Sequence, residues 1–393
     1  MKILHTADWH LGRSLGCHEL LRGQFRALAE LCSIAREERP DAIVIAGDIY
    51  DRSVPSEDSM RCFEEAVIGL SEIAPVVAIA GNHDGAGRLA HFAPVLRKAR
   101  IHIAAKEYGV VPHVALRDEH GEVRFHLMPF AMPTETRHSL SKQGPDIDPA
   151  SMSTHHDATE ARVRTIDLCA DARHVLVGHL FTQSDRGPEV SDSERDISIG
   201  GTTSVGRSVF DGFHYVALGH LHKPHDVDPG RVRYAGSIGR FSFSEESHKK
   251  SVSIVDLDRD GATTIREVHI PQDQSMRTIK GPLSTVLAAA PADEAGRTSF
   301  VRIELEDLVP QFEAFQRLSK HYPFLVEMSY TRREGGANNA PATDRPERQD
   351  PMAMVRAFCL DRLGEPGLSH EAMTLAEELM DRARRDGAEA GSP

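Results

Sequence analysis

The chain has 393 residues, of which 40% are hydrophobic and 27% charged, and a formal net charge of −13. This length allows two or three domains with cores of their own, and no apolar run approaches the roughly 20 residues that span a bilayer. The N-terminus lacks the basic and long apolar segments of a secretory signal, so we expect none. The five cysteines are scattered without a Cys-x-x-Cys pair, which favours reduced thiols in the cytoplasm.

Residues 1–130 alternate short β-like runs with amphipathic stretches. Residues 19–39 and 56–73 carry apolar side chains at spacings of three and four, which predicts two helices, the second with Ser56 as its N-cap. Alternating strands and helices predict layered α/β packing. Residues 131–160 are polar, and we interpret them as a long excursion near a functional site. Residues 162–171 are predicted to form a further helix.

Later segments predict a second sheet and a smaller domain. Strands are expected at residues 232–234, 251–257 and 265–270, and with the earlier strands they favour two sheets packed face to face with helices outside. From Gln272 to residue 330 the pattern becomes β-α-β-α-β. The predicted fold class is therefore α/β: a two-sheet α/β sandwich over residues 1–271, with a small α+β capping domain over 272–330.

The C-terminal part reads differently again. Residues 331–349 are rich in Gly, Asn and Pro, which indicates a linker. Residues 350–385 predict two short amphipathic helices that are too isolated to be stable alone. We expect them to dock on a partner, with docking on this chain itself as the alternative. Residues 386–393 are expected to be a disordered tail.

Five polar motifs each follow a short apolar run. They are Asp8-Trp9-His10, Gly47-Asp48-Ile49-Tyr50-Asp51, Gly81-Asn82-His83-Asp84, Gly178-His179 and Gly219-His220-Leu221-His222. Residues i and i+2 of an extended chain share one side, so Asp8 with His10, and His220 with His222, align if the chain stays extended past the strand end. Strands that end at one rim would bring seven ligands together. Those ligands are Asp8, His10, Asp48, Asn82, His179, His220 and His222. Such a set of oxygen and nitrogen donors is typical of a two-metal hydrolytic site for Mn²⁺, Fe²⁺ or Zn²⁺.

A single motif of this kind is also explained by ordinary polar loop residues after a buried strand. That explanation does not account for five such motifs in this order. The glycines of the last four motifs are expected to allow sharp turns. Asp48 is the best candidate for a bridge between two metals, because a carboxylate has two oxygens. His83 is expected at the rim, where an imidazole supplies a proton or charge to a leaving group, with Asp84 orienting it. The alternative is a structural hydrogen bond from His83.

Several further residues are candidates with ordinary alternatives. Arg13, Arg52 and Arg88 are predicted phosphate contacts, although solvated surface arginines explain them as well. Ser237 and the loop of residues 239–244 are expected to offer backbone NH groups to a phosphate, with a tight strand connection as the alternative. Trp9 either packs in the core or stacks on a base. Asp51 either steadies a ligand or is a plain turn residue.

The ordered motifs resemble the metallophosphoesterase (calcineurin-like phosphoesterase) superfamily. Residues 4–13, 48–52 and 234–237 resemble more specifically the SbcD family, the nuclease subunits of bacterial SbcCD complexes. This resemblance is strong over residues 1–260 and fainter to residue 385. It implies that one metal is held by Asp8, His10, Asp48 and His222. It implies that the other is held by Asp48, Asn82, His179 and His220.

The resemblance also implies an activity and partners. The expected enzyme is an Mn²⁺-dependent DNA exonuclease and endonuclease that acts on double-stranded ends and hairpins in repair and recombination. The expected partners are a coiled-coil ATPase of the SbcC type, bound by residues 350–385, and a second copy of the chain. Helices near residues 19–39 would pair the copies, although their apolar stripe more simply faces its own sheet.

Two other hypotheses for the function are also considered. A net charge of −13 is unusual for a DNA enzyme, which needs a basic face, and it favours a nucleotide, cyclic nucleotide or phosphoprotein substrate as the alternative. A regulatory binding module with purely structural metals is a third hypothesis. The complete ligand set together with His83 argues against that third hypothesis.

Overall fold

The computed structural model describes residues 1–142, 152–182, 191–194 and 204–331. The predicted C-terminal helices and tail lie outside these residues, as does the predicted linker apart from Thr331. Residues 1–331 form one unit. None of the helices in this described part is both long and apolar enough to cross a membrane.

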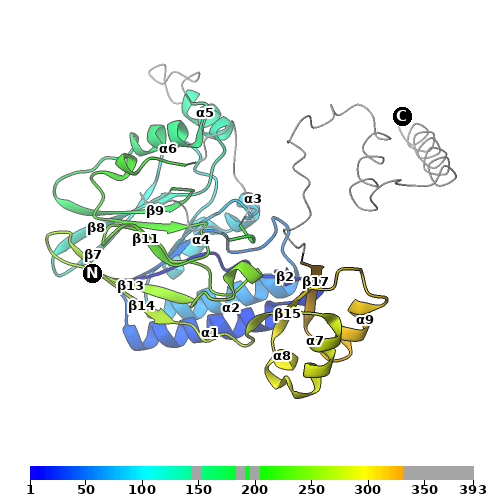
Figure 1. Ribbon diagram of the computed structural model, residues 1–393. Helices are drawn as coiled ribbons and strands as arrows, with labels where there is room; N and C mark the ends of the chain where they lie inside the picture. The colour runs from blue at the N-terminus through cyan, green and yellow to red at the C-terminus, as the bar shows by residue number, and fades with distance from the viewer. Residues whose placement is uncertain (143–151, 183–190, 195–203, 332–393) are drawn as a thin grey trace, which may run out of the picture. The chain divides into compact units, whose positions relative to one another are not determined.

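The first of two six-stranded sheets is mostly parallel (Figure 1). It contains the parallel strands β1 (Lys2–Thr6), β4 (Ala42–Ala46), β5 (Val76–Ile79) and β6 (Ile101–Ala104), extended antiparallel by β13 (Ser251–Leu257) and β14 (Thr263–His269). Parallel strands covered on both faces need an unbroken apolar run. The sequence Ala-Ile-Val-Ile-Ala of β4 meets that need, and all five residues are buried.

The second sheet has the same plan. It contains the parallel strands β8 (Gly121–Met128), β9 (Ala172–His179), β10 (Tyr215–Gly219) and β12 (Val232–Tyr234), with β7 (His113–Asp118) and β11 (His225–Asp228) antiparallel at its edges. The two sheets stack face to face, as predicted (Figure 1). In both sheets the polar motifs follow the carboxyl ends of the parallel strands.

Alternation along the strands divides the core into layers. Ile3 and Val44 point between the sheets and share a cluster with Val175. Their neighbours Leu4 and Ile43 point the other way, toward helices α1 (Leu21–Glu38) and α2 (Glu57–Ile73) on the outer face (Figure 1). The apolar stripe of α1 is therefore used against its own sheet. Ser56 caps α2 as predicted, because its hydroxyl accepts from the Ser59 amide at 3.2 Å.

The region of residues 131–171 differs from its prediction. The supposed excursion contains α5 (Pro133–Ser141) and α6 (His155–Val163), and the helix predicted over 162–171 is wrong, since α6 ends at Val163. Helix α6 begins earlier because Thr154 and Asp157 form a capping box. The Asp157 amide donates to the Thr154 hydroxyl at 3.1 Å, and the Thr154 amide donates to the Asp157 carboxylate at 3.0 Å.

The region after residue 272 has its own three-stranded parallel sheet and core. Strands β15 (Met276–Gly281), β16 (Phe300–Leu305) and β17 (Leu325–Tyr330) alternate with α7 (Leu283–Ala289), α8 (Glu294–Thr298) and α9 (Ala314–Ser319). The predicted β-α-β-α-β order is present, and α8 is an addition. The remaining short elements are β2 (Ser14–Leu15), β3 (His18–Glu19), α3 (Ala86–Leu89), α4 (Ala93–Leu96) and the 3-10 turns Arg97–Ala99, Arg207–Phe210, Phe243–Glu245 and Ala290–Ala292.

Candidate two-metal centre

The seven predicted ligands converge on one buried place between the sheets. Loops after β1, β4 and β5 of the first sheet, and the ends of β9 and β10 of the second, supply Asp8, His10, Asp48, Asn82, His179, His220 and His222. His10 Nε2 lies 3.1 Å from His222 Nε2. His179 Nε2 lies 2.9 Å from Asn82 Oδ1, and His220 Nδ1 lies 3.3 Å from the same oxygen. Each sheet contributes part of the set, so neither sheet holds the centre alone.

Asp48 stands in the middle of the set. Its Oδ2 lies 3.6 Å from His10 Nε2 and 3.5 Å from His179 Nε2, which belong to the two different predicted metal sites. Its Oδ1 accepts the His83 backbone amide at 2.8 Å. Burial alone would raise the pKa of Asp48, but the imidazoles of His179 and His10 hold that pKa well below its ordinary value. An ionised carboxylate in this position fits the predicted bridging role.

Strained backbone brings these ligands together. Asp8, His10, Asp48 and His220 have positive φ angles of 52°, 44°, 47° and 111°. Such conformations cost about 1–3 kcal/mol for a residue other than glycine and persist where the surroundings enforce them. The expectation that extended chain aligns Asp8 with His10 is therefore wrong. Tight left-handed turns align them, held by hydrogen bonds from the Asp8 amide to the Gly47 carbonyl (3.0 Å) and from the His10 amide to the Asp48 carbonyl (2.9 Å).

Three of the four motif glycines are required by close approach, and a Cβ at Gly219 would lie 2.0 Å from the Ala46 carbonyl oxygen. A Cβ at Gly47, which has φ +90°, would lie 2.4 Å from His179 Nδ1, and a Cβ at Gly81 would lie 2.2 Å from Asp48 Oδ1. Any larger residue at either position would push a ligand out of place. Gly178 differs, because a Cβ there would meet its nearest atom at an ordinary 3.4 Å. The glycine before His179 is therefore not demanded by the site.

The hydrogen bonds of His222 show that the donor set fits a cation. Ser193 Oγ donates to Glu245, so its lone pair accepts from His222 Nδ1 at 2.7 Å. Burial lowers the pKa of His222 to about 3, so the ring is neutral and its Nε2 carries a lone pair. The lone pair on His222 Nε2 faces His10 Nε2. The other nitrogen of His10, Nδ1, lies 3.5 Å from the Asp51 carboxylate. Imidazole nitrogens and carboxylates that face one another in this way form a site for a divalent cation.

His179 leads to the same conclusion for the other site. Its Nδ1 donates to the Ala46 carbonyl at 2.9 Å, which leaves Nε2 facing two acceptors, Asn82 Oδ1 and Asp48 Oδ2. Burial lowers the pKa of His179, but the carboxylates of Asp48 and Asp8 outweigh that effect and raise it to about 9. In the metal-free protein a proton on Nε2 would thus take the place of a cation.

His83 lies at the rim of the set, as expected. Its Nδ1 donates to the Asp51 carbonyl at 2.8 Å, which turns Nε2 toward the centre, 3.9 Å from Asp48 Oδ2. Asp84 does not orient this ring in the way expected. Its carboxylate accepts the backbone amides of Ile49, Tyr50 and Gly81 at 3.1, 2.9 and 2.9 Å, so it shapes the turn that carries Asp48.

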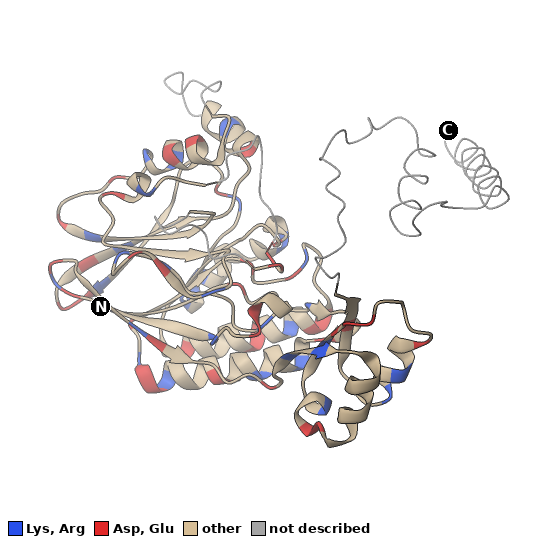
Figure 2. Ribbon diagram, viewed as in Figure 1, with Lys and Arg blue, Asp and Glu red and all other residues tan. Residues whose placement is uncertain are grey.

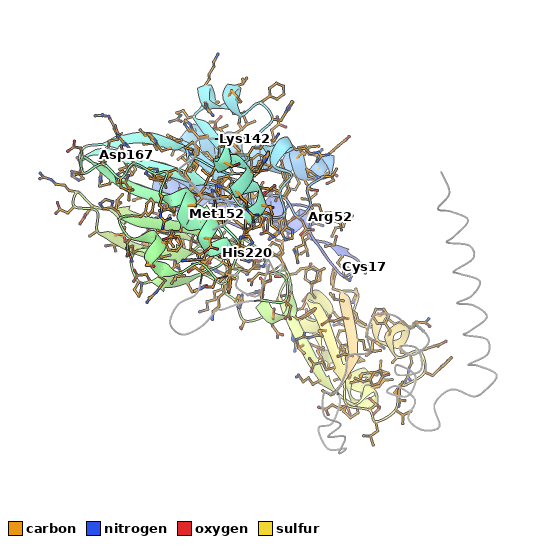
Figure 3. All side chains as sticks on the ribbon, turned by 90° about the horizontal axis from the view of Figure 1, so that it is seen from above. Cys17, Arg52, Lys142, Met152, Asp167 and His220 are labelled. Atoms are coloured by element: carbon orange, nitrogen blue, oxygen red, sulfur yellow. The ribbon has the colours of Figure 1, made fainter. Side chains whose placement is uncertain are left out.

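The candidate phosphate contacts differ in their exposure and in their hydrogen-bond partners. Ser237 is fully buried and its backbone NH donates to the His222 carbonyl at 3.1 Å, so this NH is not available to a phosphate. Arg13 is partly buried and pairs with Asp51 at 2.8 Å. Arg88 donates to the Ser53 carbonyl at 3.0 Å. The side chain of Arg52 is 77% exposed and lies at the domain edge, whereas His220 lies inside the domain (Figure 3).

Two side chains near the metal ligands were not predicted as site residues. Gln24 of α1 donates to the Trp9 and His10 carbonyls at 3.0 and 2.7 Å and accepts the Gly12 amide at 3.0 Å, which fixes the first ligand loop. The Phe241 ring packs edge-on against His10 and His222 at 5.3 and 5.6 Å and forms an apolar wall. The core alternative for Trp9 holds, because the ring is fully buried and Nε1 donates to Thr6.

Comparisons with known proteins assign the first part of the chain to a family. Residues 1–224, more than half of the 393, match the family model described as calcineurin-like phosphoesterase. Residues 272–362 match the SbcD_C model, described as the type 5 capsule protein repressor C-terminal domain. A Thermus thermophilus structure is 14% identical, with a TM-score of 0.39 over 68% of this chain and 98% of its own. A dimetal phosphatase from Danio rerio is 13% identical, with a TM-score of 0.40 over 69% and 99%.

Proposed function

The chain belongs to the calcineurin-like phosphoesterase family, and we propose that it is the Mn²⁺-dependent DNA exonuclease and endonuclease of an SbcCD-type complex. One observation carries this proposal: a phosphoesterase domain and an SbcD-type C-terminal domain occur in one chain, in that order. The proposed substrates are double-stranded DNA ends and hairpins, and the proposed setting is DNA repair and recombination in the cytoplasm. Imidazole, carboxylate and amide donors accommodate Mn²⁺, and its choice over Fe²⁺ or Zn²⁺ follows the family resemblance.

The residues have distinct parts in phosphodiester hydrolysis. One metal would be held by Asp8, His10, Asp48 and His222, and the other by Asp48, Asn82, His179 and His220. When bound, the two ions would activate water and neutralise the charge that develops on phosphorus. His83 is directed into the site by its bond to the Asp51 carbonyl. Its imidazolium donates a proton from Nε2 to the departing sugar oxygen.

The alternative is a smaller or different phosphoester, and charge is what favours it. Helix α2 carries five acidic residues and one basic residue, Arg61, and α1 carries three arginines and three glutamates, so neither helix presents a continuous basic strip (Figure 2). The net charge of −13 would repel DNA unless a local basic surface, bound metal or a partner offsets it.

A substrate panel tests the proposal directly. Purified full-length protein with one Mn²⁺ stock is given a labelled DNA hairpin, a blunt duplex, a nucleotide, a cyclic nucleotide and a phosphopeptide. We expect cleavage of both DNAs, because an SbcD-type nuclease acts on phosphodiesters at ends and hairpins. An EDTA-treated sample is the control and should be inactive on all five. Rapid turnover of a nucleotide or phosphopeptide with inert DNA would reject the nuclease assignment.

A truncation tests the proposed partner. Without residues 350–393 the chain should still fold and bind Mn²⁺, because all seven ligands lie before residue 223. It should remain a homodimer, since exposed apolar side chains such as Met60 and Ile68 remain on α2. It should no longer co-purify from the cytoplasmic fraction with a coiled-coil ATPase, and ATP-dependent duplex cutting should disappear. Pull-down, light scattering and cleavage are compared with the full chain, and undiminished ATPase binding would place the tether elsewhere.

A further inference from the structure

We propose that Glu245 and Lys250 form a buried ion pair that holds His222 in its metal-binding form and sets the affinity of one metal site. This inference rests on the proposed two-metal function but not on the identity of the substrate. Neither residue belongs to the motifs that predicted the centre. Both come from the segment between β12 and β13, which returns past the end of β10.

Glu245 reaches His222 by two routes. Its Oε1 lies 3.3 Å from His222 Nδ1, and it also accepts from the Ser193 hydroxyl, which itself lies 2.7 Å from that nitrogen. The Glu245 carboxylate has no proton to donate, and the Ser193 hydroxyl already donates its proton to Glu245. Both groups can therefore only accept a hydrogen bond from His222 Nδ1. Two acceptors therefore hold a proton on Nδ1, and Nε2 is left to face the metal site.

Lys250 completes the arrangement. Its Nζ donates to Glu245 Oε2 at 2.6 Å, to Ser237 Oγ at 2.8 Å and to the His222 carbonyl at 3.0 Å, so all three of its donors are used. It fixes the Glu245 carboxylate behind the His222 ring and also holds the backbone of this ligand. Both side chains of the pair are fully buried.

Stability alone does not account for such a pair. Removing two charges from water costs free energy that their attraction often fails to regain, and apolar replacements are often no less stable. The contacts with His222 supply another reason for its presence. A carboxylate behind a metal-binding imidazole fixes the ring and increases its basicity, and partners of this kind change metal affinity by about 10–100-fold.

The two metal sites differ in this respect, which makes the inference testable. His179, a predicted ligand of the other site, rests its Nδ1 on a neutral backbone carbonyl, that of Ala46. A substitution at Glu245 should therefore weaken one site and spare the other. A general loss of folding would weaken both together.

The test is Mn²⁺ binding by calorimetry with the Glu245→Gln protein. We expect one of the two dissociation constants to rise about 10–100-fold while the other stays within twofold of wild type. Glu246→Gln is the matched control, because Glu246 lies in the same turn but bonds to Thr278 at 2.8 Å. Its two constants should equal those of wild type. Unchanged constants in Glu245→Gln, or equal weakening of both in a folded protein, would overturn the inference.

A second variant, Ser193→Ala, and an NMR measurement on the wild-type protein keep the inference testable if Glu245→Gln does not fold. Ser193→Ala removes only the linking hydroxyl and should weaken the same site by a smaller factor. In metal-free wild type labelled with ¹⁵N-histidine, the NMR shifts of His222 should report a proton on Nδ1, and a proton on Nε2 would also overturn the inference. Failure of wild type to cleave DNA would reject the proposed substrate but leave these binding results standing. Failure of wild type to bind two ions would reject the two-metal function itself.

Discussion

Replacement of His83 by alanine should lower DNA cleavage by about 10²–10⁴-fold while both metals stay bound. The ring is held by the Asp51 carbonyl with Nε2 toward the centre, where it can give a proton to the leaving oxygen. Turnover and metal content by elemental analysis are measured on the same samples. His120→Ala is the control, because His120 is an exposed histidine of the β7–β8 turn. Its activity and metal content should match wild type.

The geometry also defines the rival outcome. Ligand atoms of His10, Asp48 and His83 lie within 4.8 Å of one another, close enough for the three to share an ion. If His83→Ala loses one metal equivalent, His83 is a ligand and its assignment to proton transfer is wrong. If metals are retained and cleavage persists at the wild-type rate, the imidazole has only a structural role.

Replacement of Asp48 by asparagine should be more severe. A bridging carboxylate serves both metals, and its Oδ2 faces histidines of both predicted sites. An amide has no charge and presents one oxygen instead of two, so occupancy should fall at both sites and cleavage should become undetectable. Calorimetry with Mn²⁺ and hairpin cleavage are the measurements. Asp167→Asn, a change at a side chain that is 86% exposed, should leave both unaltered.

Two retained metals with near-normal activity in Asp48→Asn would show that Asp48 does not bridge. Loss of a single metal would be equally informative, because it would assign Asp48 to one site. The comparison with Glu245→Gln then becomes useful. Both variants would weaken the His222 site, but only Asp48→Asn should also weaken the His179 site.

The fold could be predicted because its signals are local. Apolar runs such as Ile43–Val44–Ile45 are readable as buried strands, and each metal motif adjoins one of them. The helix prediction over residues 162–171 is wrong because the signal that starts this helix lies earlier in the chain. The sequence Thr154-His155-His156-Asp157 contains the capping box that begins α6.

Only the site residues that belong to the sequence motifs could be predicted. Gln24, Phe241 and Lys250 contact the ligands or their loops through tertiary packing, and their local sequence gives no signal of these contacts. Ser237 illustrates the converse. The Gly236-Ser237 pair after a strand predicts backbone NH groups for a phosphate, but the Ser237 NH donates to the carbonyl of His222, whose approach the local sequence does not reveal.

The division of the ligands between two sheets has a consequence for how the protein is made. Asp8, His10 and Asp48 are synthesised long before His220 and His222. Strand β1 also pairs with β13, which lies near the end of the domain in the sequence, so this pairing forms late. The emerging chain therefore lacks its last two ligands until more than half of its 393 residues have been made. The proposed two-metal centre can therefore be completed only after β10 and the loop that follows it have joined the second sheet.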